Sequence, residues 1–308
     1  MIGVSVGNGE RRRGTVIDGV LLLDKPVGPS STKVLGHVKH LLNASKAGHG
    51  GTLDPLASGL LPLMFGESTK YAAEGLDADK GYRAEILLGQ KTSTGDAEGN
   101  VIHSAPVPAL TSETIEAALS HFRGPQQQIP PMYSALKKDG RALYAYAREG
   151  QEIDRAPRAI VIHQLTLVSW QLPNLTVDIR CSKGTYVRVL AEDIGQALGV
   201  PATLAALRRT SVGQLTTQDL VPLEAIESAA PNERSAFLKP VDWLIRDWPA
   251  VVLTLEQQRR FQQGQVILLA SGDPGLVRVY SATQDFLGTG RLAADSRLHP
   301  ERVRVLTS

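Results

Sequence analysis

The chain has 308 residues, of which 42% are hydrophobic and 21% are charged, and its formal net charge is +2. A chain of this size can bury a large core and is long enough for one large domain plus a small one. One cysteine excludes a disulfide framework, and no apolar run is long enough to span a membrane. Because the net charge is only weakly basic, a nucleic-acid site would have to be a local patch.

The N-terminal segment, residues 1–15, contains glycine and the run Arg11–Arg13 but no apolar stretch of the signal-peptide type. We therefore expect a flexible tail and a cytoplasmic protein that does not contact a membrane.

Periodicity in the first half of the chain predicts both strands and helices. Apolar or alternating runs predict strands at 20–23 and 82–88. Ser30 or Ser31 can cap a helix, and Thr111 or Ser112 can cap another. The apolar stripes of these helices are Val34, Leu35, Val38, Leu41 and Leu42 for the first, and Ile115, Ala118, Leu119 and Phe122 for the second.

The second half of the chain continues the mixed pattern. Strands are predicted at 160–168 and 175–181, and a helix follows with the stripe Val187, Leu190, Ala191, Ile194 and Leu198. After Trp248–Pro249, short segments at 276–280, 286–292 and 302–306 predict a small β domain. Because strands and helices do not alternate strictly, the fold class is expected to be α+β.

A glycine-rich bend at 48–59 carries one carboxylate, Asp54, directly before Pro55. One interpretation is structural: Asp54 caps a helix, Pro55 is its first residue, and Leu56, Leu60 and Leu63 share one face. The other is functional, because glycines ahead of a carboxylate let a bulky ligand approach closely.

Residues 124–153 break the pattern, because basic side chains alternate there with Tyr133, Tyr144 and Tyr146. This mixture suits phosphate contact and stacking on exposed bases, although a plain surface excursion would look similar. Candidate contributors to a basic patch on the whole chain are Lys33, Lys39, Lys46, Arg83, Lys137, Lys138, Arg141, Arg148, Lys183, Arg208 and Arg209.

Three segments, 19–31, 48–59 and 181–188, resemble in order and spacing the TruB family of tRNA pseudouridine-55 synthases. The likeness runs from about residue 17 to the C-terminus. It implies a pseudouridine synthase fold, with a mixed, largely antiparallel sheet flanked by helices, at 16–247. It also implies an RNA-gripping, thumb-like insertion at about 124–153 and a PUA-like RNA-binding β domain at 248–308.

The resemblance also implies a reaction: base flipping and isomerisation of uridine to pseudouridine in the T loop of tRNA. The family nucleophile corresponds to Asp54, and the arginine that pairs with it corresponds to Arg188, which would orient the carboxylate as a bidentate partner. The alternative for Arg188 is a surface pair with Glu192, four residues along a helix.

Four further positions match family residues of the substrate site. Tyr82 would lie against the flipped base and is a candidate for proton transfer, whereas the alternative is a tyrosine that merely packs. Tyr186 and Leu207 would line the base pocket, or belong to the core. His49 would fill the vacated position in the RNA stack, although a histidine between glycines is more often a turn residue.

The isomerisation is redox-neutral, so no cofactor or metal is expected, and the histidines and the cysteine show no ligand spacing. We expect tRNA as the partner, through its T-arm loop, and a monomer that uses no guide RNA. Two alternatives remain open at this point. One is the guide-RNA-dependent branch of the same superfamily, and the other is a tRNA-binding or tRNA-folding protein in which Asp54 is only a helix cap.

Overall fold

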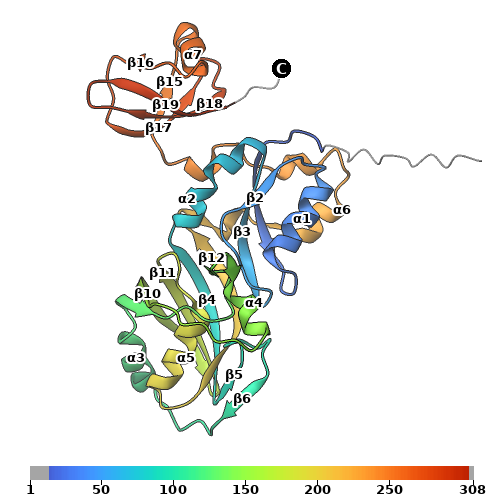
Figure 1. Cartoon of the computed structure of the whole chain (residues 1–308), viewed down its shortest axis with the longest axis vertical. Helices are drawn as coiled ribbons and strands as arrows, with labels where there is room; N and C mark the ends of the chain where they lie inside the picture. The colour runs from blue at the N-terminus through green and yellow to red at the C-terminus, as the bar shows by residue number, and fades with distance from the viewer. Residues whose placement is uncertain (1–13, 305–308) are drawn as a thin grey trace, which may run out of the picture.

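The computed structural model describes residues 14–304, and its main feature is a ten-stranded mixed sheet (Figure 1). Eight strands follow one another in the order β14-β1-β3-β12-β4-β11-β10-β7, while β13 pairs with β12 and β2 with β3. The β1–β14 and β3–β12 pairs are parallel and the others are antiparallel. The strands are β1 (Gly19–Lys25), β2 (Ala47–His49), β3 (Ala57–Phe65), β4 (Lys80–Leu88), β7 (Gly124–Gln128), β10 (Arg158–Gln171), β11 (Asn174–Cys181), β12 (Ala202–Val212), β13 (Leu215–Thr216) and β14 (Val221–Pro222).

Helices flank this sheet, and two hairpins extend from it. The helices of this part are α1 (Ser31–Leu41), α2 (Ala72–Asp77), α3 (Ser112–Ser120), α4 (Leu143–Arg148), α5 (Val187–Ala197) and α6 (Leu223–Ser228), with 3-10 turns η1 (Gly66–Tyr71), η2 (Thr217–Asp219), η3 (Arg234–Phe237) and η4 (Trp243–Ile245). The hairpins pair β5 (Gln90–Thr92) with β6 (Val101–Ser104), and β8 (Lys137–Lys138) with β9 (Arg141–Ala142).

The helix starts follow from capping. Ser30 accepts the Lys33 amide and begins α1, and Thr111 accepts the Thr114 amide and begins α3. Both caps and both apolar stripes agree with the sequence expectation.

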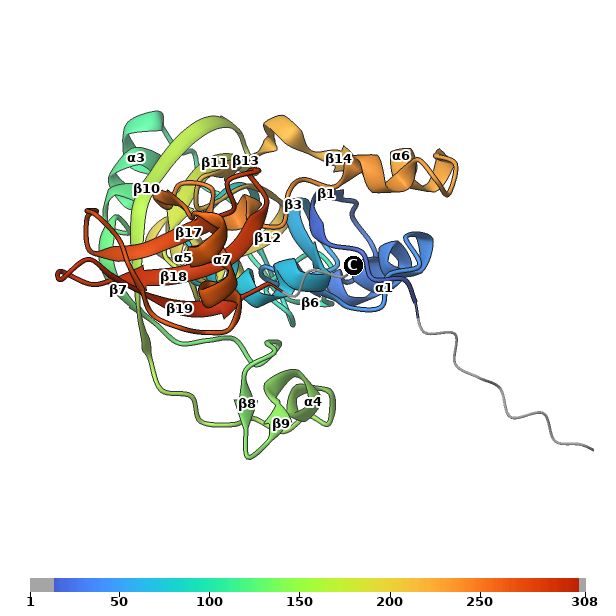
Figure 2. The same cartoon turned by 90° about the horizontal axis from the view of Figure 1, so that it is seen from above.

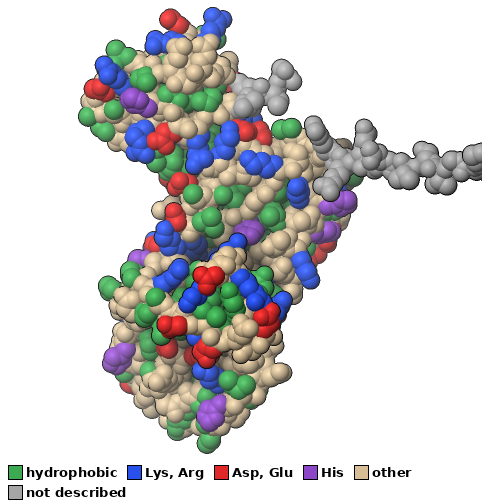
Figure 3. Space-filling view, viewed as in Figure 1, with side chains coloured by type: hydrophobic (Ala, Val, Ile, Leu, Met, Phe, Trp, Pro, Cys, Tyr) green, Lys and Arg blue, Asp and Glu red, His purple; other side chains and the backbone are tan. Residues whose placement is uncertain are grey.

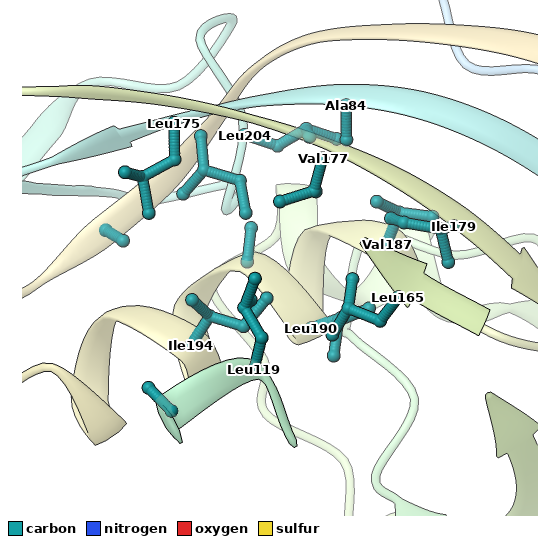
Figure 4. Packing of buried hydrophobic residues seen from close by; sticks show 14 of the residues in the cluster. Ala84, Leu119, Leu165, Leu175, Val177, Ile179, Val187, Leu190, Ile194 and Leu204 are labelled. Carbon is teal, nitrogen blue, oxygen red and sulfur yellow. The ribbon is translucent and has the colours of Figure 1, made fainter. Parts of the chain in front are cut away.

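Two apolar cores lie against the large sheet. One packs α3 and α5 onto β4, β10, β11 and β12, and Figure 4 shows Leu119, Leu190 and Ile194 facing Val177 and Leu204. The other packs α1 and Ile226 of α6 against β1 and β3. These two cores hold the strand ends that carry the site.

The C-terminal part forms a second, five-stranded sheet in the order β15-β17-β18-β19-β16. Its elements are β15 (Ala250–Val252), α7 (Leu255–Gln262), β16 (Ile267–Leu268), β17 (Gly275–Tyr280), β18 (Phe286–Leu292) and β19 (Arg297–Val303). It has its own core around Phe261 and Leu287, and it stands at one end of the molecule (Figure 1). The expected small β domain is therefore present, with one helix added.

The segment between β7 and β10 leaves the body of the protein. Figure 2 shows β8, β9 and α4 standing away from the sheets, whereas residues 124–128 of the predicted insertion form β7 within the large sheet. Within it, the Arg141 and Arg148 guanidiniums lie over the rings of Tyr146 and Tyr144, at 4.6 and 5.3 Å from the ring centres.

Two sequence expectations are corrected. The apolar run after Pro55 is the strand β3 and not a helix, because its residues are needed on both faces, between β1 and β12. The last described strand, β19 (Arg297–Val303), begins before the expected segment 302–306, since its pairing with β18 begins at Leu298, and residues 305 and 306 lie outside the described part of the chain. The expected tail, 1–15, lies almost wholly outside the described residues. Among the residues described, no helix is long and apolar enough to cross a bilayer.

Candidate active site

A cavity of about 360 Å³ opens beside the start of β3, where several predicted residues meet. Asp54, Tyr82, Tyr186, Arg188 and Leu207 all line it, although they come from four separate segments, the β2–β3 loop, β4, the start of α5 and β12. The volume and the mixed apolar and charged lining suit one small planar ring. His49 does not line this cavity.

Asp54 lies in the loop between β2 and β3, and its side chain is 46% exposed. The backbone ahead of it adopts the left-handed region at Gly51, with φ of 124°, which only glycine adopts readily. A Cβ on Gly51 would lie 3.5 Å from the Arg209 guanidinium, an ordinary van der Waals distance. The backbone conformation, and not a lack of space, is therefore what favours glycine in the loop that presents the carboxylate.

Arg209 holds that loop from behind. Its side chain is 1% exposed, and it donates to the carbonyls of Leu60, Thr52 and Gly51 at 2.7, 3.3 and 3.1 Å. Burial lowers the pKa of this guanidinium, while Tyr82 acts in the opposite direction. Its expected place in a surface basic patch is wrong, because β12 turns it inward.

Arg188 connects Asp54 to the rest of the site. Its Nη2 lies 2.9 Å from Asp54 Oδ2, and the side chain is 8% exposed. Its Nη1 donates to the carbonyl of Thr94 at 3.0 Å, and the same Nη2 also donates to the carbonyl of Tyr133 at 2.7 Å. The pairing with Asp54 is thus present, but through one nitrogen and not as the expected bidentate contact. Glu192 instead lies 3.1 Å from Lys91, so the surface-pair alternative is wrong.

A second carboxylate, which the sequence did not single out, lies on the far side of Arg188. Asp96 Oδ2 is 3.6 Å from Arg188 Nε, and the residue is 3% exposed. Thr94 Oγ1 and the Glu98 amide donate to Asp96 Oδ1 at 2.5 and 3.1 Å. The hydrogen-bonded Asp96 can therefore fix the plane of the guanidinium that meets Asp54. Only the short polar turn around it could have drawn attention to this residue.

Tyr82 lies in β4 at the floor of the cavity and also packs against both cores. Burial raises the pKa of its hydroxyl, while a hydrogen bond with Arg209 opposes the shift. Leu207, on the neighbouring strand β12, likewise lines the cavity and packs against both cores. Both the lining and the packing interpretations thus apply to these two residues.

Two lysines near Asp54 are buried. Lys25 is 0% exposed and donates to the carbonyls of Ala57 at 2.7 Å and Pro26 at 2.9 Å, and burial lowers its pKa to about 8, with Asp54 opposing the shift. Lys80, in the cavity wall, donates to the carbonyls of Leu76 and Ala78, and burial likewise lowers its pKa to about 8. Asp54 therefore lies near buried amines, of which Lys25 interacts electrostatically with its carboxylate.

His49, at the end of β2, is partly buried, and its Nδ1 has no hydrogen-bond partner among the described residues. Burial, followed by Arg209, lowers the pKa of the imidazole, so the ring is neutral at neutral pH. Across residues 14–304 there is no cluster of three or more His, Cys, Asp or Glu side chains that could hold a metal.

Comparisons with known proteins cover nearly the whole chain. Residues 39–187 match the model of the TruB family pseudouridylate synthase N-terminal domain. Residues 188–246 match the tRNA pseudouridylate synthase B C-terminal domain, and residues 249–303 match the C-terminal domain of pseudouridine synthase II TruB.

Curated relatives carry one name. A tRNA pseudouridine synthase B of Burkholderia mallei is 51% identical over 296 residues, which cover 94% of this chain and 97% of the relative. Another, of Cupriavidus pinatubonensis, is 49% identical over 298 residues, which cover 93% of this chain and 94% of the relative.

Solved structures share the fold. An H/ACA RNP bound to a substrate RNA containing 2′-deoxyuridine matches with a TM-score of 0.69 at 21% identity, covering 98% of this chain and 93% of that chain. A Cbf5-Nop10-Gar1 complex matches with a TM-score of 0.68 at 24% identity, covering 92% of this chain and 84% of that chain. At these identities the likeness concerns the fold alone.

Proposed function

The chain belongs to the TruB family of pseudouridine synthases and isomerises uridine to pseudouridine in tRNA, and we propose that its target is position 55 in the T loop. Asp54 is the proposed nucleophile. The observation that carries this proposal is the ion pair of 2.9 Å between Arg188 and a half-exposed Asp54 at the mouth of a ring-sized cavity.

The reaction breaks the N1–C1′ bond, turns the uracil and joins C5 to C1′, while the C5 proton is lost and N1 is protonated. An ionised carboxylate can attack C1′ or C6, or stabilise a cation at C1′. Arg188 pairs with Asp54 and directs its carboxylate, and Tyr82 lies against the ring and is the candidate group for moving the C5 proton. Because the sum is a redox-neutral isomerisation, we propose that neither cofactor nor metal takes part.

Entry of the base into the cavity requires that it leave the RNA stack. Extrusion costs a few kcal/mol, and each stacking contact returns about 1 to 3 kcal/mol. Tyr82 and Tyr186 line the cavity that would receive the base, whereas His49 lies outside it. A neutral imidazole in that place suits the gap that the flipped base leaves, and we assign His49 this part.

Binding of the tRNA is assigned to two parts of the chain. The insertion at 124–153 offers exposed Lys137 and Lys138, and residues 250–303 form the second sheet. In Figure 3, Lys and Arg side chains gather around the insertion and where the second sheet joins the rest of the chain. We propose the catalytic domain at 16–247 and an RNA-binding domain at 248–308, in a monomer.

We also propose that no guide RNA is needed. The relatives of about half identity are named as tRNA pseudouridine synthases, whereas the H/ACA assemblies match at 21–24% identity. Conversion of an unmodified tRNA transcript by the purified protein alone tests this directly, and a requirement for an added RNA would contradict it.

The nucleophile is tested with Asp54→Asn, which keeps the size of the side chain and removes its charge. Pseudouridine formation on tRNA transcripts should fall below roughly a thousandth of the wild-type rate, while tRNA affinity stays within several-fold. Higher residual turnover would refute the assignment. Retained activity in this variant, together with normal binding, would leave Asp54 as a structural residue of the loop. Only a wild-type protein that binds tRNA without converting it would leave the alternative of a tRNA-binding protein.

A further inference from the structure

Gln128, the last residue of the edge strand β7, makes an unusual contact with a distant segment. Its Oε1 accepts the Tyr186 amide at 2.8 Å, and its Nε2 donates to the Tyr186 carbonyl at 3.1 Å. One side-chain amide thus satisfies both polar groups of a single residue 58 positions away. Gln128 is only 6% exposed, so the loss of either bond would leave a poorly solvated partner.

Tyr186 is the N-cap residue directly before α5, and its side chain makes no capping hydrogen bond to that helix. Arg188 is two residues further on, in the first turn of α5. Because the first turn has backbone groups without helical partners, its orientation depends on what holds the preceding residue. In this chain Gln128 binds both backbone groups of Tyr186, the preceding residue, and so fixes the direction in which Arg188 points toward Asp54.

Gln128 also stands where the insertion leaves the sheet. It pairs with Arg158 on β10, the strand to which the insertion returns. Beyond it, the Tyr133 carbonyl accepts from the Nη2 of Arg188 that meets Asp54, and Ser134, which is 5% exposed, lines the same cavity as Tyr186. The segment 128–134 is therefore hydrogen-bonded to the segment 186–188 through two residue pairs, Gln128 with Tyr186 and Tyr133 with Arg188.

We propose that Gln128 is a positioning residue for the reaction. It fixes Tyr186 and, through it, Arg188, and so ties the root of the RNA-gripping insertion to the pair of Arg188 and Asp54. This inference rests on the proposed function, because it assumes that Arg188 directs a catalytic Asp54. It adds that the geometry of this pair depends on a residue that does not line the cavity.

The test is Gln128→Met, which keeps the length of the side chain but removes both bonds. With tRNA at saturation and well below the melting temperature, the single-turnover rate should fall at least about 10-fold, while tRNA affinity stays within about 3-fold. Gln128→Glu keeps the acceptor for the Tyr186 amide, and its single-turnover rate should lie between those of wild type and Gln128→Met. Gln127→Met, on the exposed neighbour in β7, is the matched control and should behave as wild type.

A merely structural role would lower the melting temperature and leave the saturated rate unchanged, which would overturn the proposal. Coupling to Arg188 is measured by adding Gln128→Met to Arg188→Lys. If Gln128 acts through Arg188, adding Gln128→Met to Arg188→Lys should lower the single-turnover rate by less than about 2-fold. A further fall as large as in the wild-type background would overturn the proposal. Asp54→Asn distinguishes failure of the proposed function from failure of this inference. An active Asp54→Asn variant refutes the proposed function, whereas a Gln128→Met variant with a normal rate refutes only this inference.

Discussion

Arg188 makes a set of contacts that requires the planar guanidinium and that a lysine ammonium could not reproduce. It meets Asp54, Asp96 and the carbonyls of Thr94 and Tyr133 from a nearly buried position. A guanidinium has five donors in a fixed plane, whereas an ammonium is a point charge on a flexible stem. Burial of this charge is tolerable because every direction of the fork has a partner.

Arg188→Lys should therefore lower the single-turnover rate by about 10²-fold or more and change tRNA binding little, because the lost contacts matter most in the transition state. Rates and affinities at several salt concentrations check this. If Arg188 only neutralised an RNA phosphate, the saturated rate of Arg188→Lys would be near normal, and Arg188→Ala would flatten the salt dependence by about one counterion. A normal rate for Arg188→Lys would end the assigned role of the Asp54–Arg188 pair.

At the scale of elements, the site depends on three neighbouring strands. Strand β3 follows the Asp54 loop directly and lies between β1 and β12, which supply Lys25 and Arg209. Gly59 makes this close packing possible, since a Cβ there would come within 2.4 Å of the Arg209 carbonyl. The buried cations thus meet the loop because the strands bring them there in register.

The buried Lys25 leads to a prediction about pH. Its pKa is about 8 in the fold and 10.5 in the reference state, so the unfolded chain binds more protons between these values. Stability should therefore rise by on the order of 3 kcal/mol as pH increases from about 8 to 10.5, and the same amount should be lost as pH falls from 10.5 to about 8. Urea unfolding of wild type and Lys25→Met at pH 7 and pH 10 checks it. The free energy of unfolding of wild type, relative to that of Lys25→Met, should be larger at pH 10 than at pH 7. An equal difference at the two pH values would contradict the prediction.

At the scale of the whole molecule, two sheets are joined by a compact contact. Tyr71, Val241, Ile245 and Phe286 form a small apolar cluster between them, and Asp242 accepts from Arg278 at 3.0 Å. Arg304 and Asp18, 286 residues apart, close a second contact at 3.1 Å. These contacts give the second sheet a defined place beside the large one, so that one RNA can meet both parts and the insertion (Figure 1).

The share of the insertion in tRNA binding is tested by changing Lys137 and Lys138 together. The double change to Ala should weaken affinity and reduce the slope of log K against log salt by up to about 2, because two phosphate contacts are lost. The rate at saturating tRNA should stay within a few-fold. The double change to Arg keeps both charges and is the control. An unaltered slope in the Ala variant would exclude these lysines from the interface.

The sequence by itself determined what depends on neighbours along the chain. The caps at Ser30 and Thr111, the stripe of α5 and the class of the fold follow from local hydrogen bonding and periodicity, and the motif around Asp54 indicated the family. It did not determine that the run after Pro55 is a strand, because an apolar segment buried on both faces has no diagnostic period.

The tertiary structure decided which side chains support Asp54. Asp96, Arg209 and Gln128 are 92, 149 and 58 positions from Arg188, Leu60 and Tyr186, the residues that they contact. Nothing local distinguishes a buried Asp, Arg or Gln from a solvated one, because burial is set by what packs over it. The candidate carboxylate, Asp54, was therefore readable from the chain, whereas the network that holds it in place arises only when distant strands meet.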